Sequence, residues 1–150
     1  MIFQMQEGYL TLATGDWQDR SVNMLAANHL PVKGTNLVVT REALPEGVSF
    51  TDYLANQKSV LAKELPGFKL LTDSSDDMNG RPVHYLEVAW DNQGVTMQQM
   101  ILVIDNNRSI LNFTATMPGE VDEQSCTELL AVMRSFRPGP APAERGGTAP

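Results

Sequence analysis

The sequence contains few of the features on which functional assignments usually rest. It has 1 cysteine in 150 residues, which excludes an intrachain disulfide, and no apolar run is longer than five residues, as from Met100 to Ile104. A bilayer-spanning helix needs roughly 20. The 11 basic residues are scattered and outnumbered by 18 acidic ones. Nucleic acids and anionic membranes reward clustered Lys and Arg, so we expect no nucleic-acid partner and no direct membrane anchoring.

Motifs for catalysis, metal binding and cofactor binding are also missing. The chain has no Gly-x-Ser-x-Gly elbow, no His-Glu-x-x-His motif and no phosphate-binding glycine loop, and His29 and His84 lie far apart in sequence. Cys126 falls on an apolar helical stripe, which favours a buried structural thiol over a nucleophile. The sequence therefore predicts no enzyme, no catalytic residue, no cofactor and no metal site.

The first ten residues do not have the pattern of a secretory leader. A leader begins with a basic stretch followed by an apolar one, whereas here Gln4, Gln6 and Glu7 interrupt the apolar residues and the first basic residue is Arg20. A single cysteine agrees with a reducing compartment. We therefore expect a cytoplasmic protein.

Apolar periodicity predicts the elements of the first half of the chain. Alternating apolar residues predict short strands at 9–13, 21–26 and 36–41, arranged as a meander. Ser49 stands three residues before Asp52 and is followed by apolar residues at helical spacing, which is typical of a helix N-cap. We expect this helix to end near Leu65, before Pro66-Gly67.

The second half predicts a larger sheet and a second helix. After residues 69–72, a solvated acidic turn containing Asn79-Gly80 is expected, followed by three strands at 82–90, 95–104 and 109–116 that are joined by tight turns. A helix is expected at 120–136 with Cys126, Leu129, Leu130 and Met133 on one face. The fold class is α+β, an antiparallel sheet packed with two helices. We assign residues 1–137 to one domain and 138–150 to a disordered Pro/Gly/Ala-rich tail.

Two amides stand at apolar positions of these elements. Gln57 falls within the apolar stripe of the first helix, and either Gln98 or Gln99 interrupts an apolar face of the strand at 95–104, because alternate strand side chains point to opposite faces. Leaving a buried amide unpaired costs about 1–3 kcal/mol. Each amide therefore turns to solvent, has a partner inside the fold, or meets an apolar ligand that carries polar groups of its own.

A series of short segments, in order and spacing, carries a resemblance that covers essentially residues 1–135. They are Asp16-Trp17-Gln18-Asp19, Ser21-Val22-Asn23-Met24, Val39-Thr40-Arg41, Phe50-Thr51-Asp52-Tyr53 running to Gln57, Leu65-Pro66-Gly67-Phe68-Lys69, and the strand from Gly80 to Trp90. Together they resemble the Eag chaperones of type VI secretion, a branch of the DcrB-related family.

The resemblance implies a DcrB-like fold with a concave apolar sheet surface. It also implies a cytoplasmic homodimer that binds and shields the N-terminal transmembrane helices of a secreted effector, of PAAR or Rhs type, before loading and export. In such chaperones, glutamines on the apolar surface replace the hydrogen bonds that the helices make to one another in a membrane. Two alternatives stay open at this point: a periplasmic DcrB-like domain of unknown role and a small-ligand-binding domain.

The same resemblance assigns residues to client-helix binding. Gln57 matches the family's helix glutamine, Ile101 falls where its strand glutamine is expected, and Gln99 lies two residues earlier on the same strand face. The remaining positions assigned to the groove are apolar: Val22, Met24, Val38, Leu61, Leu65 and Met97.

Overall fold

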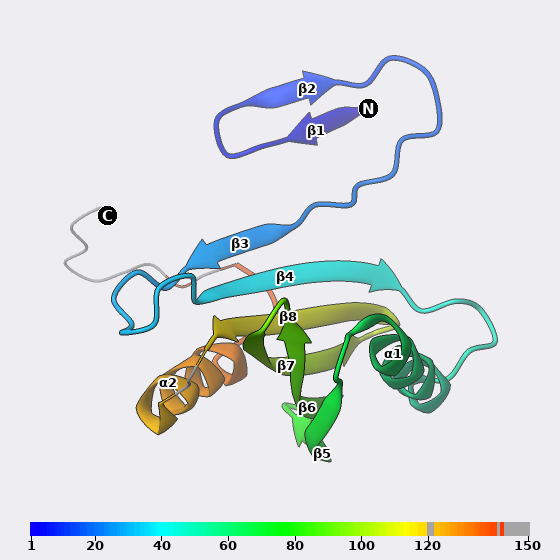
Figure 1. Ribbon diagram of the computed structural model, residues 1–150. Coiled ribbons are helices and arrows are strands. Elements are labelled where there is room, and N and C mark those ends of the chain that lie inside the picture. Colours follow the sequence, from blue (N-terminus) through cyan, green and yellow to red (C-terminus); the bar gives the residue numbers. More distant parts are fainter. Residues whose placement is uncertain (120–121, 141, 143–150) are drawn as a thin grey trace.

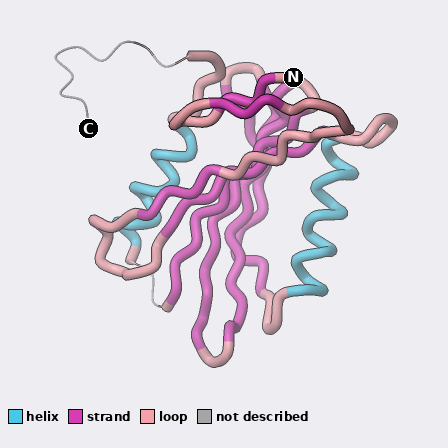
Figure 2. Tube along the Cα trace, turned by 90° about the horizontal axis from the view of Figure 1, so that it is seen from above, coloured by secondary structure: helices cyan, strands magenta, loops and turns pink. Residues whose placement is uncertain are grey.

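A six-stranded antiparallel sheet organises the protein, with one helix packed on each face (Figures 1 and 2). The computed structural model describes residues 1–119, 122–140 and 142. The strands follow the spatial order β3-β4-β8-β7-β6-β5. Their bounds are β3 Asn23–Ala26, β4 Asn36–Ala43, β5 Lys69–Met78, β6 Arg81–Asn92, β7 Val95–Asn106 and β8 Ser109–Pro118, and the helices are α1 Phe50–Glu64 and α2 Glu123–Arg134.

Tight turns connect β5 to β8, as the sequence predicts. Asn79, Gln93 and Asn107 all have φ between 52° and 55°, and each is followed by a second residue with positive φ. This left-handed pair is the geometry that matches the twist of two-residue hairpins. Arg108 is the one second residue that is not a glycine. Its guanidinium Nη2 donates to the Pro45 carbonyl at 2.8 Å and so ties this hairpin to the loop before α1.

The face covered by α2 forms a complete apolar core. Leu102, Ala115 and Met133 are each 0% exposed there, and Leu129 belongs to the same cluster. The helix begins after its N-cap Asp122, whose carboxylate accepts from the Ser125 backbone N–H at 2.9 Å. The predicted apolar face is confirmed, but the helix is shorter than 120–136, and residues 120 and 121 lie outside the described part of the chain.

On the other face, α1 begins and ends where the sequence predicts. The Ser49 hydroxyl accepts from the Asp52 backbone N–H at 3.1 Å, and Leu65 is the C-cap. Tyr53 and Leu54 are buried in a second cluster with side chains of β6, β7 and β8. This cluster contains no residue of β3 or β4, so α1 covers only part of its face.

The N-terminal third is not the single meander that the alternating pattern predicted. Strands β1 (Ile2–Gln4) and β2 (Tyr9–Thr11) form a separate two-stranded sheet, while β3 and β4 join the main sheet. We name residues 1–22 the N-terminal arm, whose β1–β2 hairpin stands clear of the main sheet (Figure 1). Alternation identified β2 and β3 but could not show which strands pair, because pairing depends on contacts distant in sequence.

The predicted acidic turn at 73–80 is wrong over most of its length, since β5 continues through it to Met78. Acidic residues are unfavourable in most strands, but β5 is an edge strand and its outward carboxylates stay in water. Asp73 and Ser75 lie opposite Leu86 and His84 of β6. Contacts to His84, described below, favour the extended conformation.

The predicted disordered tail, 138–150, falls largely on residues 141 and 143–150, which lie outside the described residues. Within the described residues, neither helix combines the length and apolar content that a membrane crossing needs.

We expect Met133→Ala to lower the free energy of unfolding by about 2–5 kcal/mol, because the side chain is fully buried and its loss leaves a cavity. The control is Val132→Ala on the same helix, where the side chain is 48% exposed and the change should stay within about 0.5 kcal/mol. Urea unfolding followed by circular dichroism measures both. Equal losses in the two variants would contradict the assignment of the α2 face.

Candidate functional site

Strand register places the predicted groove residues on one face of the sheet. Directly opposed residues of antiparallel strands share a face, and the register links Leu86 to Ile101, Ile101 to Thr114, Thr114 to Val38 and Val38 to Met24. Leu86 packs in the cluster with α1. The whole row, from β6 across to β3, therefore lies on the α1 side of the sheet.

The same register decides which strand glutamine faces this side. Gln99 lies opposite Val88 and Thr116, both on the α1 face, whereas Gln98 lies opposite Met117, which is buried under α2. The alternative that the sequence left open is thus settled in favour of Gln99.

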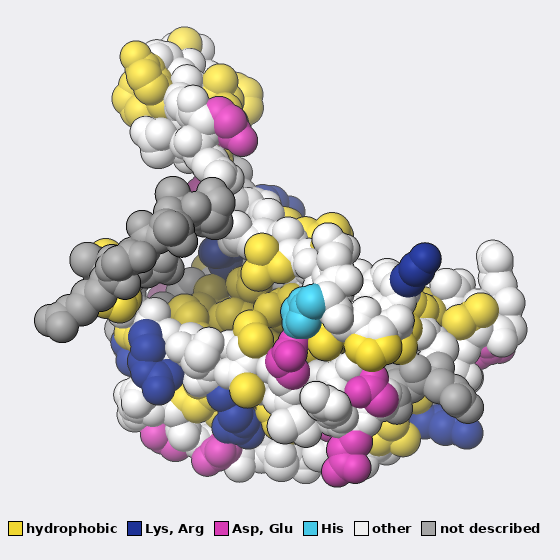
Figure 3. Space-filling model, turned by 90° about the vertical axis from the view of Figure 1, so that its left-hand side faces the viewer, with side chains coloured by type: hydrophobic (Ala, Val, Ile, Leu, Met, Phe, Trp, Pro, Cys, Tyr) yellow, Lys and Arg dark blue, Asp and Glu magenta, His cyan; other side chains and the backbone are white. Residues whose placement is uncertain are grey.

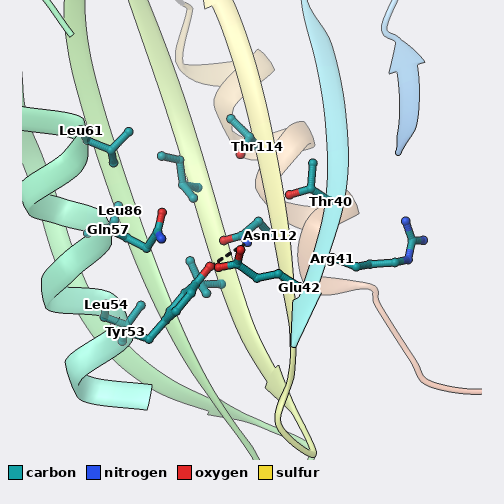
Figure 4. Close-up of a pocket in the computed structure, with 12 residues that line it drawn as sticks. Thr40, Arg41, Glu42, Tyr53, Leu54, Gln57, Leu61, Leu86, Asn112 and Thr114 are labelled. Carbon is teal, nitrogen blue, oxygen red and sulfur yellow. Dashed lines mark hydrogen bonds between the residues drawn. The ribbon is translucent and has the colours of Figure 1, made fainter. Parts of the chain in front are cut away.

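A cavity of about 330 Å³ lies between α1 and the uncovered part of this face. Figure 4 shows Tyr53, Gln57 and Leu61 extending from α1 towards β4 and β8. The cavity is bounded by α1 on one side and by strands β4, β6, β7 and β8. Its lining residues are Thr40, Arg41, Glu42, Tyr53, Leu54, Gln57, Leu61, Leu86, Ile101, Val103, Asn112 and Thr114.

The structure brings most of the predicted site residues together. Gln57, Leu61 and Ile101 line the cavity itself. The others, by register or position, extend the same face or its border: Val38, Met24, Met97 and Gln99 on the strands, Leu65 at the end of α1, and Val22 one residue before β3. Val22 and Met24 are 56% and 68% exposed, so the β3 end of this face is apolar and open.

The two glutamines differ in what they contact. The Gln99 amide Nε2 donates to the Thr116 hydroxyl at 3.2 Å, so it has a partner inside the fold. Gln57 is half-buried in the cavity wall, and its amide makes no hydrogen bond to another described residue. Gln57 is therefore neither fully turned to solvent nor satisfied by the fold.

Apart from Gln57, the polar residues of the cavity were not predicted from the sequence. The Asn112 side-chain amide donates to the Tyr53 hydroxyl at 3.3 Å. Burial and the neighbouring Glu42 carboxylate raise the pKa of Tyr53 to about 12, so this hydroxyl stays protonated at neutral pH. The available signal was the alternation of β8, in which Asn112, Thr114 and Thr116 alternate with buried apolar residues.

Comparison with known proteins places this architecture in a family. The family model of DcrB matches residues 7–135. The chain belongs to the DcrB family.

This DcrB protein is 27% identical over 145 residues to the protein named effector EagT6 of Pseudomonas aeruginosa, a match that covers 95% of this chain and 99% of EagT6. The crystal structure of PA94, a Pseudomonas aeruginosa protein of unknown function described as a putative regulator, superposes with a TM-score of 0.75. That match has 25% identity and covers 94% of this chain and 98% of PA94. The resemblance to Eag proteins and the DcrB-like α+β fold are thereby confirmed.

A second polar cluster in this DcrB protein joins α1 to the sheet edge. His84 is 7% exposed, and its ring contacts the Ser75 hydroxyl through Nδ1 at 2.9 Å and the Asp73 carboxylate through Nε2. The same carboxylate accepts from Lys58 of α1 at 3.0 Å. A Ser-His-Asp nucleophile uses the two ring nitrogens the other way round and keeps its Asp for the histidine. The contact to Lys58 gives this cluster a structural explanation, because it fixes α1 beside β5.

The cluster makes stability depend on pH. Burial alone would raise the pKa of Asp73, but hydrogen bonds and charges from Lys58 and His84 outweigh it and lower the pKa below its ordinary value. A carboxyl with a lowered folded pKa contributes stability that is complete above its unfolded pKa of about 3.9 and is lost as the pH falls through the folded value.

We therefore expect Asp73→Asn to be less stable than the wild type at pH 7 but to lose less of its remaining stability on acidification below about pH 4. Urea unfolding at a series of pH values from neutral to about pH 3 measures both curves. Parallel curves over that acidic window would show that the Asp73 contacts do not contribute.

Proposed function

We propose that this protein is a cytoplasmic chaperone that binds and shields the N-terminal transmembrane helices of a type VI secretion effector, of PAAR or Rhs type, before export. The observation that carries the proposal is the half-covered α1 face, on which apolar side chains and Gln57 line an open cavity and Gln99 lies on the same face beyond it. Similarity to EagT6 supports a role connected with a secretion effector.

The chemistry of this face suits an apolar helix. A spanning helix of about 20 apolar residues exposes a large surface in water, and covering it is worth roughly 25 cal/mol per Å². Its backbone hydrogen bonds are already made within the helix, so the binding surface needs to supply only apolar area and partners for side chains. Leu61, Val38 and Met24 supply the area, and Gln57 has an unused amide.

Apolar area alone would not fix where a helix sits. Interhelical side-chain hydrogen bonds in membranes contribute about 0.6–2 kcal/mol each. Gln57, and the Gln99 Oε1 that the contact to Thr116 leaves free, would therefore define the register of the client more than its total affinity. A small-ligand-binding domain would instead use an enclosed pocket. Here the face continues past the cavity to the exposed Met24 of β3, which favours an elongated ligand.

We also propose that the protein is a homodimer. In the described residues, 9 of the 13 exposed large hydrophobic side chains lie within residues 1–25, and Figure 3 shows hydrophobic side chains gathered on the arm. Four of them, Met1, Ile2, Leu10 and Trp17, border a cavity of about 540 Å³ within the arm. An isolated two-stranded hairpin is marginally stable at best in water. A second copy, packed by two-fold symmetry, would cover both arms at once.

We expect light scattering at micromolar concentration to report about twice 16.5 kDa for the wild type. Leu10→Asp should shift the protein to the monomer, because it would place an unpaired charge in the covered arm surface. The control is Val95→Asp, where the valine is 47% exposed against 49% for Leu10 but lies outside the arm. A wild-type monomer, or equal behaviour of the two variants, would contradict the arm as the dimer contact.

We expect the double variant Gln57→Leu, Gln99→Leu to fold normally and to bind the client about 30-fold more weakly, assuming that each lost hydrogen bond contributes about 1 kcal/mol. Co-purification of a tagged effector N-terminus measures binding, and circular dichroism checks the fold. The matched control is Gln98→Leu, because Gln98 lies on the same strand but faces the α2 side. Unchanged recovery with the folded double variant would contradict the role of the amides.

A further inference from the structure

Strand β8 carries two different chemistries on its two faces. Under α2 its residues are uniformly apolar and buried, namely Leu111, Phe113, Ala115 and Met117. On the cavity side, after the buried Ile110, the next three residues are polar and half-buried, namely Asn112, Thr114 and Thr116. Alternate residues of a strand point to the same face, so these three polar side chains are successive neighbours on the cavity side of β8.

Two members of the row have partners inside the fold and the third does not. Asn112 is bonded to Tyr53 and Thr116 to Gln99. Thr114 has no side-chain hydrogen bond to another described residue, and the same holds for Thr40, which lies beside this row on β4, opposite Asn112. Both hydroxyls line the cavity, and Figure 4 shows Gln57 facing them from α1.

The Thr40 and Thr114 hydroxyls and the Gln57 amide, which lack hydrogen-bond partners among the described residues, restrict what can occupy the cavity. A purely apolar occupant would remove the water from two half-buried hydroxyls and an amide without replacing their hydrogen bonds, which is unfavourable. An occupant with polar side chains at the right spacing would satisfy them. Thr40 on β4 lies opposite Asn112, so Thr40 and Thr114 are diagonal neighbours on adjacent strands, which stand about 7–8 Å apart. Residues four apart on a helix are about 6 Å apart, so one helix can place two such side chains against both hydroxyls.

We propose that Thr40 and Thr114, together with Gln57, form a hydrogen-bonding seat that selects client helices carrying Ser, Thr or similarly small polar residues at i, i+4 spacing. This inference rests on the proposed function and adds a selection rule to it. Small polar residues allow close approach between a helix and its partner and offer hydroxyls at the contact. Apolar residues beside the two threonines, such as Val38 on β4, would then contact the flanks of the same helix.

The test compares two client helices in direct competition. Both are leucine-based segments of about 20 residues, each fused to the same soluble carrier protein. One carries two serines four residues apart, and the other carries alanines at those positions. The two fusions are co-expressed with the tagged full-length protein, and the recovered ratio of serine helix to alanine helix is measured. We expect the wild type to enrich the serine helix roughly 5- to 10-fold.

The double variant Thr40→Val, Thr114→Val removes both hydroxyls but keeps the side-chain shape. Its recovery ratio of serine helix to alanine helix therefore shows whether the face recognises polar groups or only apolar area. If the two hydroxyls bind polar groups of the client, the ratio of serine helix to alanine helix falls to about 1 in this variant, while the alanine helix is still recovered. The matched control is Thr96→Val, since Thr96 has the opposite strand parity to Gln99 on β7 and so lies on the other face of the sheet. Its ratio should equal that of the wild type.

Two results would overturn the seat. A wild-type ratio of about 1, or an unchanged ratio in the double variant, would show that the face selects only apolar area, and the proposed chaperone function would stand. Failure of the wild type to recover either helix would overturn the seat and the proposed function together.

Discussion

The unequal covering of the sheet by its two helices is the constraint on which the rest of the structure depends. Helix α2 closes its face with a continuous buried cluster. Helix α1 packs through Tyr53 and Leu54 on a buried cluster with β6, β7 and β8. A helix is about 10–12 Å wide and neighbouring strands lie about 4.8 Å apart, so α1 covers only part of the six-stranded face and leaves β3 and β4 uncovered. The α2 face of the sheet is therefore fully buried, whereas the part of the α1 face on β3 and β4 is left uncovered and accessible to a partner.

The uncovered part of the α1 face carries a mixture of apolar and polar side chains. A surface meant only for water would not gather Ile101, Val38 and Met24 on one face, and a surface meant only for the core would not place Gln57 and Thr114 among them. The mixture matches an occupant that is mostly apolar and carries a few polar side chains. The N-terminal arm likewise exposes more apolar side chains than a lone hairpin can bury.

Much of the fold could be predicted because it is encoded locally. Ser49 and Asp52 define the start of α1, the turn residues define the hairpins, and strand parity places Gln99 with Ile101. The extension of β5 through its acidic residues could not be predicted, because it depends on the partners that Asp73 and Ser75 find on β6 and α1. The separate arm was missed for the same reason. The assignment of Gln57 came from resemblance, and its place in the cavity wall required the structure.

The central claim, that the open half of the α1 face receives an apolar helix, is tested most directly by methyl NMR of the protein in complex with an effector N-terminal segment. Val38 is half-buried on the open part of the α1 face and Val83 lies in the α2 core, so the two valines provide an internal comparison. We expect intermolecular contacts from the client to the Val38 methyl groups and none to those of Val83. Contacts confined to the outer surface of α2, with Val38 unaffected, would contradict the claim.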